Sequence, residues 1–370
     1  MTRPDASDST PRGVVQFGAG SWGMSWLRKV DESPHFELRA LVEPMPEARE
    51  KAWGSGIDRR LCFASLQEAL SAGLDLQVGV IVTPPATHRD VALEAMEAGL
   101  DLLVEKPLAD NLDAARETVE RAGALGRTLM VSQNYRFKRA PRTVQRLVAQ
   151  GTIGRIEQVR IVYQKNPPFE DFRVQMDEPV IVDMAVHHLD QIRGLLGVEP
   201  VRLRARSWNP SWSRFRGNAS CLIEMEAEDG AQVIYTGSWG STGPQTTWDG
   251  DWDIQGAAGG ILWEQNRVRI GFSSVFDTVF LPGARERDGM MDVDLDPVAC
   301  EERAGVLDEL HAALEGARAP ETQGRDNLRS LALVLAAVES ARSDGAFVEL
   351  PGAGGSGANN EPSRRLTRPE

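Results

Sequence analysis

A short apolar strand that runs into a glycine-rich turn is the feature that most constrains the fold of this chain. Residues 13–17 read as a buried strand, the sequence Gly18-Ala19-Gly20-Ser21-Trp22-Gly23 follows at once, and residues 24–30 can continue as a helix. Glycines at these spacings allow a tight turn, close approach of the backbone to a pyrophosphate, and close helix packing. The helix N-terminus then faces the phosphates. We therefore expect a dinucleotide site formed by Gly18, Gly20, Ser21, Trp22 and Gly23.

An acidic residue stands where such a site needs one. Residues 36–42 form a second predicted strand, and Glu43 follows it, 20 positions after Gly23. A carboxylate there would hold the ribose 2′-hydroxyl of NAD and repel the 2′-phosphate of NADP. NAD is therefore the expected cofactor, with Glu43 as a ligand. Two alternatives stay open: Glu43 is a solvated loop acid, or the nearby Arg49 admits NADP.

The chain then keeps alternating between helical and strand patterns. Helices are predicted at 66–72, 87–98 and 112–124, and strands at 76–82, 102–104 and 128–132. This alternation is typical of a parallel, doubly wound sheet, the Rossmann arrangement. Its ligands bind at the carboxyl ends of the strands. Just past such ends lie Glu43, Thr83, Lys106 and Asn134, which we expect beside the cofactor.

The pattern changes near residue 150. A linking helix is predicted at 143–149, a strand at 156–163 and a helix at 183–196. Strand-like runs follow at 201–208, 219–228, 232–239, 248–255, 260–264, 267–270 and 275–281, and helices at 301–314 and 327–343. Successive strands joined by Gly and Asp turns indicate an antiparallel sheet. The fold class is therefore α/β followed by α+β.

These patterns divide the chain into two domains between two tails. Residues 13–135 are expected to form the Rossmann domain, with a last helix at about 324–343 packing back on it. Residues 136–350 are expected to form a domain for substrate binding and oligomerisation. The polar segments 1–12 and 351–370 are expected to be disordered.

Composition excludes several classes of protein. The net charge is 41 − 54 = −13, which disfavours binding to a nucleic acid backbone. Cys62, Cys221 and Cys300 lack any metal-ligand spacing and are expected to be buried apolar side chains in a reducing compartment. With no apolar signal segment and no long apolar run, a cytoplasmic protein that does not contact membranes is expected.

Two segments carry candidate chemistry. Lys106 lies at the end of a predicted strand, within Val104-Glu105-Lys106-Pro107, and Asp183 and His187 lie four residues apart on a predicted helix. Histidine suits a general base because its unperturbed pKa lies near neutral pH. The Lys106 ammonium would stabilise a developing alkoxide. Together these groups could take the proton of an alcohol while a nicotinamide accepts its hydride.

Structural alternatives exist for each residue of that helix. Asp183 suits an N-cap position, and His187 could be a satisfied structural histidine. His188 points about 100° away from His187 and is expected to be structural. Asp190, at i+7 from Asp183, is expected to pair with a neighbour such as Arg193. A zinc site is disfavoured, because no second histidine lies at i+4 and no cysteine joins the set.

The second domain contains further residues that could contact the substrate, although no motif marks them. Tryptophans are numerous in it, including those at 208, 212, 239, 248 and 252, of which one or two at most are expected to stack on a sugar. Tyr163 is expected to contact the substrate, together with Asn134. Arg214 and Arg216 would read an acidic or hydroxylated substrate, or are simply solvated.

These motifs together resemble the glucose–fructose oxidoreductase / inositol dehydrogenase (Gfo/Idh/MocA) family. The matching stretches are Gly18 to Gly23, Thr83-Pro84-Pro85-Ala86-Thr87-His88, Glu105-Lys106-Pro107, Asn134-Tyr135-Arg136-Phe137, Asp183 to Asp190 and Leu328 to Leu333. Ala185 stands where the family most often has glycine.

The resemblance implies a Rossmann domain, an open-faced antiparallel sheet, and homodimers or homotetramers formed through that sheet. It implies that Lys106 is the catalytic lysine, His187 the proton-transfer residue and Asp183 a substrate-binding acid. It places Thr83, Pro84, His88 and Glu105 beside the cofactor, although His88 could instead be a hydrogen bonder at a helix start.

The expected activity is hydride transfer between nicotinamide and a secondary alcohol of a sugar, inositol or related polyol. Two alternatives use the same parts. One is an NAD-dependent glycosidase, which oxidises, eliminates and reduces without net redox change. The other is a cofactor-binding sensor with no turnover, since fold does not fix function.

Overall fold

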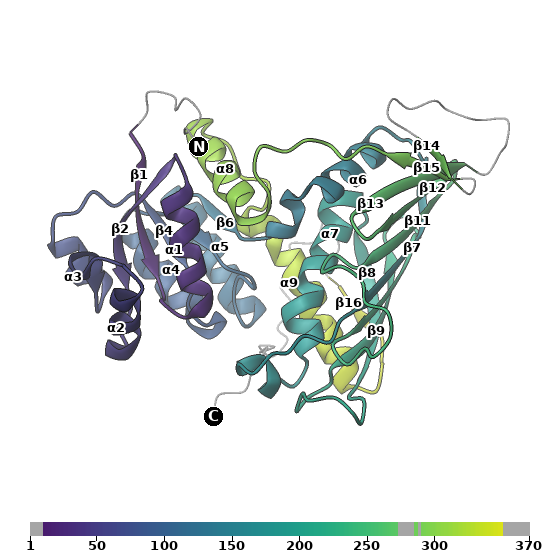
Figure 1. The fold of residues 1–370 in the computed structure, drawn as a ribbon, viewed down its shortest axis with the longest axis horizontal. Coiled ribbons are helices and arrows are strands. Elements are labelled where there is room, and N and C mark those ends of the chain that lie inside the picture. The colour runs from purple at the N-terminus through teal and green to yellow at the C-terminus, as the bar shows by residue number, and fades with distance from the viewer. Residues whose placement is uncertain (1–9, 273–284, 288–289, 351–370) are drawn as a thin grey trace. The chain divides into compact units, whose positions relative to one another are not determined.

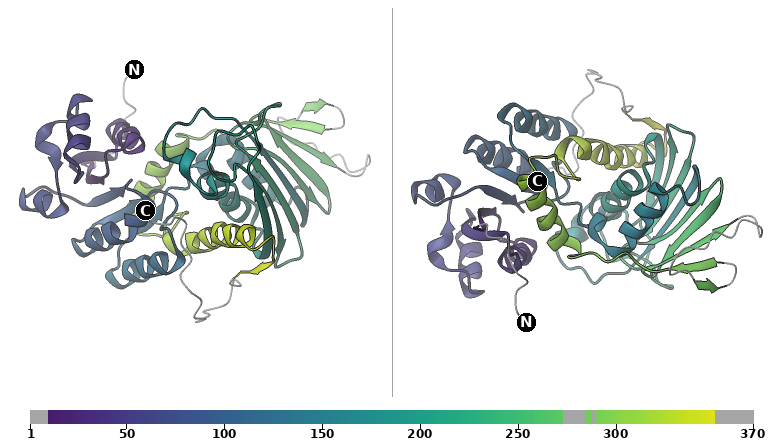
Figure 2. Two further views of the ribbon diagram at one scale, coloured as in Figure 1. Left: turned by 90° about the horizontal axis from the view of Figure 1, so that it is seen from below. Right: turned by 90° about the horizontal axis from the view of Figure 1, so that it is seen from above.

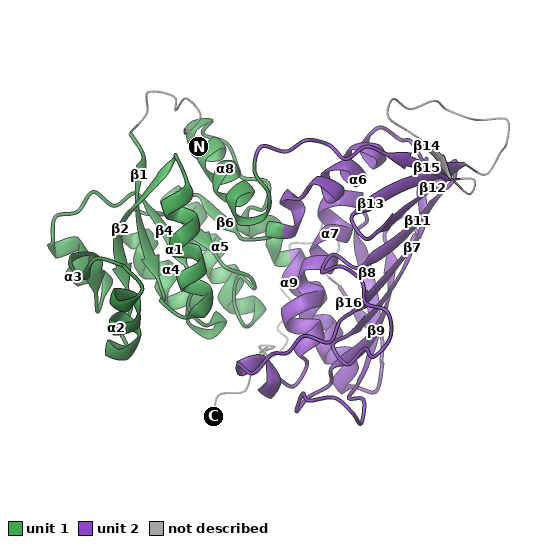
Figure 3. Ribbon diagram, in the orientation of Figure 1, with its two compact units in different colours: residues 1–134, 300–328 green, residues 135–299, 329–370 purple. Residues whose placement is uncertain are grey.

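The chain forms two compact units. In the computed structural model, residues 10–272, 285–287 and 290–350 are described. Unit 1 comprises residues 1–134 and 300–328, and unit 2 comprises residues 135–299 and 329–370 (Figure 3). The strand expected at 275–281, the tail at 351–370 and most of the tail at 1–12 lie outside the described residues. Of the first tail, Arg12 already belongs to a strand.

Unit 1 is built on a six-stranded parallel sheet (Figure 1). Its strands are Arg12–Phe17 (β1), Phe36–Val42 (β2), Cys62–Phe63 (β3), Val78–Ile81 (β4), Asp101–Val104 (β5) and Leu129–Val131 (β6). They lie in the order β3-β2-β1-β4-β5-β6, and every neighbouring pair is parallel. The chain crosses from one half of the sheet to the other between β3 and β4. The predicted doubly wound Rossmann sheet is confirmed.

The helices of unit 1 follow the strands in alternation. They are Ser21–Glu32 (α1), Pro46–Gly54 (α2), Leu66–Ser71 (α3), His88–Glu97 (α4), Leu112–Leu125 (α5) and Glu302–Glu315 (α8). Local chemistry sets several of their ends. The Ser65 side chain accepts a hydrogen bond from the Glu68 amide at the start of α3, and Asn111 caps α5 in the same way. Gly126, in the left-handed region at φ 63°, ends α5.

Unit 2 is built on a ten-stranded, mainly antiparallel sheet. Its strands are Ile156–Gln164 (β7), Pro200–Trp208 (β8), Ser220–Ala227 (β9), Gln232–Ser238 (β10), Asp251–Gly256 (β11), Gly259–Glu264 (β12), Arg267–Phe272 (β13), Arg285–Arg287 (β14), Met290–Val293 (β15) and Val348–Glu349 (β16). The order is β14-β15-β13-β12-β11-β7-β10-β9-β8-β16, in which only the described pair β7 and β10 is parallel. The predicted α+β class is confirmed.

One face of this sheet is covered by helices. Arg139–Ala149 (α6), Val186–Leu196 (α7) and the larger part of Gly324–Arg342 (α9) lie on the same side of it (Figure 2). The strands alternate between buried and more exposed residues, as in β7, where Val159, Ile161 and Tyr163 are buried between exposed neighbours. This alternation places the core between the sheet and the helices.

Several element bounds differ from the expected ones for local reasons. The strand expected at 248–255 begins only at Asp251, because the Gly250 amide donates to the Thr247 carbonyl in a turn with φ 76° at Gly250. The helix expected at 143–149 begins at Arg139, since Pro141 is tolerated in a first helical turn. Of the three cysteines expected to be buried, Cys221 is buried, whereas Cys62 is half-buried and Cys300 is exposed.

The long C-terminal helix α9 divides between the units. Residues 324–328 belong to unit 1 and residues 329–342 to unit 2. Within unit 2, the Ser330 hydroxyl donates to Asp190 at 2.7 Å, and the Ser340 hydroxyl accepts from the Ala205 amide at 2.7 Å. Within the described part of the chain, no helix is long and apolar enough to cross a membrane.

Candidate active site

The glycine-rich turn between β1 and α1 has the geometry that a dinucleotide requires. Gly18 adopts φ 98°, a conformation that favours glycine. A side-chain carbon on Gly23 would lie 2.4 Å from the Gly18 carbonyl oxygen, whereas one on Gly20 would meet no described atom within 4 Å. Gly20 caps α1 without a side chain, so amides of the first turn remain available to a phosphate. These residues therefore fit a pyrophosphate.

A buried glutamine holds this turn in place. Gln16 lies in β1, and its Nε2 donates to the carbonyl oxygens of Gly18 and Gly23, at 2.9 Å in both cases. Sequence reasoning missed this residue. The available signal was a single amide side chain inside an otherwise apolar strand, because a buried polar group needs partners nearby.

Glu43 is buried against the same turn. Its Oε2 accepts a hydrogen bond from the Ala19 amide at 2.9 Å, and its Oε1 accepts one from the Met45 amide at 3.0 Å. The side chain of Arg49 donates to the Pro44 carbonyl at 2.9 Å. With Glu43 only 8% exposed, the alternative of a solvated loop acid is excluded. A fixed carboxylate beside the glycine turn fits a ribose hydroxyl.

The other two predicted residues of the turn lie at the surface of unit 1. Ser21 begins α1 and is exposed, and Trp22 is 44% exposed. The Arg303 guanidinium lies 4.5 Å from the centre of the Trp22 ring. Burial lowers the pKa of Arg303, and the nearby Glu105 opposes that effect. Trp22 thus presents one face to a cation.

Glu105 fixes the backbone that carries Lys106. The glutamate is buried, its Oε1 accepts from the Trp26 indole nitrogen at 2.7 Å, and its Oε2 accepts from the Lys106 amide at 3.0 Å. The bond from Lys106 to Pro107 is a cis peptide. Both carboxylate oxygens therefore bind the protein itself, and Glu105 orients the turn after β5.

His88 ties together the turns that follow β4 and β5. Its Nδ1 lies 2.9 Å from the Pro107 carbonyl oxygen and its Nε2 lies 2.8 Å from the Thr83 carbonyl oxygen. The ring is fully buried, and this burial lowers its pKa. His88 therefore behaves as a hydrogen bonder at the start of α4, while Thr83 and Pro84 form the turn that it supports.

The parallel sheet brings the predicted unit 1 residues to one edge. Glu43 follows β2, Thr83 follows β4, Lys106 follows β5, and the buried Asn134 follows β6 at the start of a 3-10 turn over Asn134–Phe137. The carboxyl ends of parallel strands meet at the same edge of a sheet, where ligands of such sheets bind. The glycine turn after β1 lies at that edge too.

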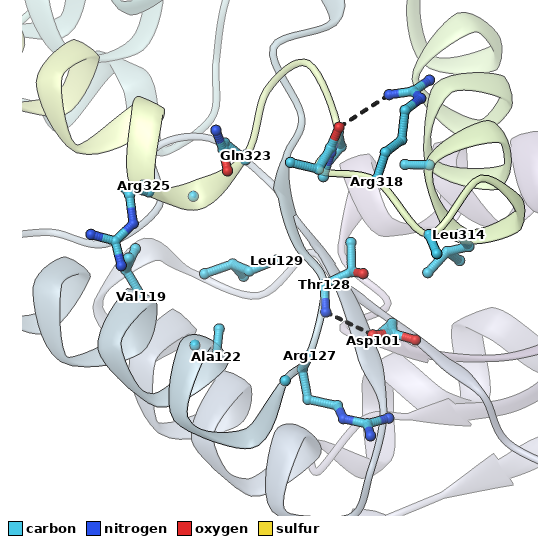
Figure 4. A pocket seen from close by; sticks show the side chains of 17 residues that line it. Asp101, Val119, Ala122, Arg127, Thr128, Leu129, Leu314, Arg318, Gln323 and Arg325 are labelled. Atoms are coloured by element: carbon cyan, nitrogen blue, oxygen red, sulfur yellow. Dashed lines mark hydrogen bonds between the residues drawn. The ribbon is translucent and has the colours of Figure 1, made fainter.

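A hollow of about 480 Å³ in unit 1 lies at the opposite edge (Figure 4). Its lining includes Asp101, the first residue of β5, and Leu129, the first residue of β6. The Asp101 carboxylate accepts from the Thr128 amide at 2.7 Å inside it. This hollow is therefore separate from the nucleotide edge.

In unit 2, Asp183 lies in a π-helical turn that precedes α7. This turn spans Val180–Ala185, so the chain is already helical before Asp183, and the N-cap of α7 is Ala185. The N-cap interpretation of Asp183 is therefore wrong. The Arg173 Nε donates to Asp183 Oδ2 at 2.6 Å. Sequence reasoning missed Arg173, because it lies in a segment without periodicity.

His187 lies in the first turn of α7 and is held by an aromatic stack. The Tyr135 ring lies parallel to the imidazole, with centroids 4.2 Å apart and planes 10° apart. The Lys138 ammonium lies 3.8 Å from the centre of the Tyr135 ring and pairs with Asp249 at 3.0 Å. This stack restricts the rotation of an imidazole that is 6% exposed.

His188 has a structural environment. It is fully buried, its Nδ1 lies 3.2 Å from the Tyr235 hydroxyl and its Nε2 lies 3.1 Å from the Trp248 carbonyl oxygen. Burial lowers its pKa to about 4, and the nearby Lys138 adds to that effect. This agrees with the expected structural role.

Asp190 pairs with Arg136, and the expectation of an Arg193 partner is wrong. Arg136 donates to the two carboxylate oxygens at 2.6 and 2.7 Å, and both side chains are almost completely buried. Arg193 instead pairs with Glu199 at 2.7 Å. Gly194 makes this possible, because a side-chain carbon there would lie 2.2 Å from the guanidinium carbon of Arg136.

Tyr163 lies in the core of unit 2. It is fully buried, and its hydroxyl accepts a hydrogen bond from the Trp239 indole at 2.8 Å. Burial raises the pKa of Tyr163 well above 10. The expected contact of Tyr163 with a substrate is therefore not supported, because its side chain is packed inside the core.

The tryptophans divide into core and surface residues. Trp239 and Trp252 are buried, whereas Trp208, Trp212 and Trp248 are exposed, the last at 39%. Arg214 and Arg216 are exposed as well. Trp248 is the exposed indole that lies near the buried Tyr163, at 6.2 Å between ring centres.

The fold and the nucleotide edge define an NAD-binding oxidoreductase. Residues 12–133 match the oxidoreductase family with an NAD-binding Rossmann fold, and residues 141–262 match the GFO/IDH/MocA C-terminal domain. The chain therefore belongs to the Gfo/Idh/MocA family of oxidoreductases, as its motifs suggested.

Individual relatives agree with this assignment. The protein y4oX of Sinorhizobium fredii is 27% identical over 343 residues, covering 89% of this chain and 93% of the relative. An inositol 2-dehydrogenase of Rhizobium meliloti is 26% identical over 329 residues, covering 88% and 95%.

A solved structure shares the fold. An oxidoreductase from Agrobacterium radiobacter, in complex with NAD+, L-tartaric acid and magnesium, superposes with a TM-score of 0.78 at 21% identity, covering 92% of this chain and 98% of the other. At this identity the likeness concerns the fold alone.

Proposed function

We propose that this oxidoreductase is an NAD-dependent dehydrogenase that acts on a secondary alcohol of a sugar, inositol or related polyol. The observation that carries the proposal is Lys106, fixed through Glu105 at the sheet edge that also bears the glycine turn. The similarity to an inositol 2-dehydrogenase supports the substrate class. The buried Glu43 supports NAD over NADP, because its carboxylate would repel a 2′-phosphate.

In this proposal the protein handles the proton of the alcohol. NAD, when bound, supplies the hydride acceptor. His187 takes the hydroxyl proton, and the Tyr135 stack holds its ring in one orientation. The Lys106 ammonium stabilises the developing negative charge on the oxygen. Asp183 accepts a hydrogen bond from a substrate hydroxyl, and Asn134 is a further substrate contact.

We also propose a cytoplasmic homodimer or homotetramer formed through the sheet of unit 2. The face away from α6, α7 and α9 carries partly exposed apolar residues such as Val162, which is 38% exposed. Exposed apolar patches on a sheet commonly mark association surfaces. Light scattering of the purified protein tests this, and a monomer at micromolar concentration contradicts it.

Replacement of Lys106 tests the proposed chemistry. Lys106→Ala should leave the NAD dissociation constant nearly unchanged and lower kcat by roughly 100-fold or more, because a charge that acts on the transition state is lost. Lys51→Ala, at an exposed position on α2, is the matched control. Wild-type turnover by Lys106→Ala on the true substrate would show that the lysine has been misassigned.

The assay that identifies the substrate also separates the alternatives. NADH fluorescence is followed with a panel of unconjugated sugars, inositols and their acids, with NAD and NADP. Net NADH formation supports a dehydrogenase, since a glycosidase of this kind forms no net NADH. Cofactor binding without turnover of any member of the panel would support a sensor.

A further inference from the structure

An arginine that the motifs did not single out lies beside the proposed substrate acid. Arg173 belongs to a 3-10 turn over Phe172–Gln175, whose N-cap Asp171 accepts from the Arg173 amide at 3.0 Å. The Arg173 Nε donates to Asp183 Oδ2 at 2.6 Å and its Nη1 to Asp171 Oδ2 at 2.5 Å. We propose that Arg173 and Lys165 form a carboxylate-binding subsite and that the substrate is a sugar acid, an inference that rests on the proposed dehydrogenase function.

The orientation of the Arg173 guanidinium is fixed by two aromatic rings and two ion pairs. Its central carbon lies 4.9 Å from the centre of the Phe169 ring and 4.7 Å from that of Phe172. Two ion pairs and two rings therefore fix the group before any ligand arrives. A fixed guanidinium loses less freedom on binding a planar carboxylate than a free one does.

Arg173 keeps donors for a ligand. A guanidinium carries five N–H groups, and the two ion pairs engage Nε and Nη1. The Nη2 atom makes no hydrogen bond with the described residues and is not among the buried atoms of the molecule. The side chain is 20% exposed. A carboxylate can therefore approach the Nη2 edge.

Lys165 supplies a second cation on the same aromatic surface. It directly follows β7, and its ammonium lies 5.6 Å from the centre of the Trp248 ring. Trp248 lies 6.4 Å from Phe169, the ring beneath Arg173. Phe169 and Trp248 thus form an aromatic surface with one cation at each end. Within the described ranges, Lys165 has no acidic partner.

Lys165 is the cation of this subsite that forms no ion pair with a described residue. Arg173 is shared between Asp183 and Asp171, and the Asp171 side chain is 42% exposed and therefore well solvated. Among the residues that the structure describes, the Lys165 ammonium contacts the Trp248 ring and pairs with no carboxylate, and a cation–π contact does not neutralise its charge. An anionic group on the substrate would supply the missing counter-charge.

The chemistry of these groups matches a polyhydroxy acid. The carboxylate would accept hydrogen bonds from Arg173 and Lys165, and a hydroxyl would donate to the Asp183 carboxylate beside it. The apolar C–H face of the carbon chain would lie on Trp248, which is 39% exposed. A neutral polyol would use Asp183 and Trp248 but leave Lys165 without a counter-charge.

A comparison of matched acids and neutral sugars tests the subsite. The probes are hexonates and hexuronates, such as gluconate and glucuronate, against the corresponding alditols and aldoses. In Arg173→Gln and Lys165→Gln, KM for the acids should rise roughly 10- to 100-fold, the range for a lost charged hydrogen bond. KM for neutral sugars should change less than about threefold in Lys165→Gln, and should rise less than KM for the acids in Arg173→Gln, which also loses the ion pair to Asp183. Arg116→Gln, an exposed arginine on α5 paired with Asp113, removes the same charge as a control.

A binding assay keeps the test independent of turnover. Quenching of tryptophan fluorescence gives the dissociation constant of each acid and each neutral sugar in the wild-type enzyme and the variants. Equal losses for acids and neutral sugars would make Arg173 a positioning residue for Asp183 and overturn the subsite. Acids that the wild-type enzyme neither binds nor oxidises would overturn it as well.

The two proposals fail in different ways. If neutral polyols yield NADH while acids are ignored, the carboxylate subsite is wrong and the dehydrogenase function stands. If acids bind in a manner that depends on Arg173 and Lys165 but no compound yields NADH, the subsite stands and the dehydrogenase function is wrong.

Discussion

Glu43 is a carboxylate with two tasks in unit 1. It accepts hydrogen bonds from the Ala19 and Met45 amides, and by its charge it would select against a 2′-phosphate. The two hydrogen bonds make the selection possible, because they hold the negatively charged carboxylate beside the glycine turn. Cofactor preference should therefore respond to the charge of Glu43 more than to its size.

We expect Glu43→Gln to shift the cofactor preference toward NADP. The amide keeps one acceptor oxygen but removes the negative charge, so kcat/KM with NADP relative to NAD should rise by roughly 10-fold or more. One backbone amide loses its acceptor, which should lower stability by about 1–2 kcal/mol. Steady-state kinetics with both cofactors measure the shift, and Glu47→Gln, exposed in the first turn of α2, is the control. An unchanged ratio in Glu43→Gln contradicts the role of its charge.

Sequence reasoning identified residues whose position follows from local pattern. Lys106 and the glycines come at strand ends, which apolar runs and breakers mark. It missed Gln16 and Arg173, because their roles depend on partners: Gln16 supports carbonyls across the turn, and Arg173 meets Asp183 only through the path of a loop. It assigned Asp190 the partner nearest in sequence, whereas Arg136 lies 54 positions away.

At the scale of elements, α7 depends on one buried ion pair. The Arg136 and Asp190 side chains are 4% and 1% exposed, and the Ser330 hydroxyl of α9 also donates to Asp190. The same pair requires Gly194, across which the guanidinium lies. Removing one partner of such a pair leaves a buried charge without compensation.

Asp190→Asn should therefore destabilise unit 2 strongly. We expect a loss of about 3–5 kcal/mol in the free energy of unfolding, measured by urea denaturation. Asp253→Asn is the matched control, because its partner Arg160 is 61% exposed and exposed pairs contribute less than about 1 kcal/mol. Comparable losses in the two variants would show that burial does not set the contribution of the Asp190 pair.

The order of elements was more predictable than their junctions. Apolar runs of strand length and helical periodicity gave the alternation of unit 1 and the strand series of unit 2. The π-helical turn before α7 left no mark in the pattern, because Val180, Ile181 and Val182 are consecutive apolar residues, all buried, and show no helical periodicity. The sequence predicts a strand that begins at Trp248, because this tryptophan resembles a buried strand position, whereas the structure has a turn from Thr247 to Gly250.

At the scale of the whole molecule, topology was predictable only where it is local. Alternating strands and helices dictate parallel pairing in unit 1, since each crossover returns the chain in the same direction. In the ten-stranded sheet of unit 2, β7 pairs in parallel with β10, although two strands, β8 and β9, lie between them in the sequence. Such pairing between distant segments depends on packing and not on local residue preference.

Buried histidines give the whole molecule a predicted sensitivity to acid. Burial lowers the pKa of His88 and of His188, in the latter to about 4, and burial together with the nearby His35 lowers that of His311. In each case the unfolded chain binds a proton at higher pH than the folded chain does. The contribution of these neutral histidines to the free energy of unfolding is thus fully present above about pH 6.5. It is lost as the pH falls from there toward the pKa of the folded state.

His188 permits a quantitative form of this prediction. With a folded pKa of about 4 and an unfolded pKa near 6.5, it should account for a loss of about 2 kcal/mol between pH 7.5 and pH 5. His188→Gln loses hydrogen bonds to Tyr235 and Trp248, so its stability should be lower at every pH, but its dependence on pH should be shallower by that amount. Urea denaturation followed by tryptophan fluorescence at several pH values between 7.5 and 5 measures the slope. Because carboxylates titrate mainly below this range, parallel curves for the variant and the wild-type protein would mean that protonation of His188 does not limit stability in acid.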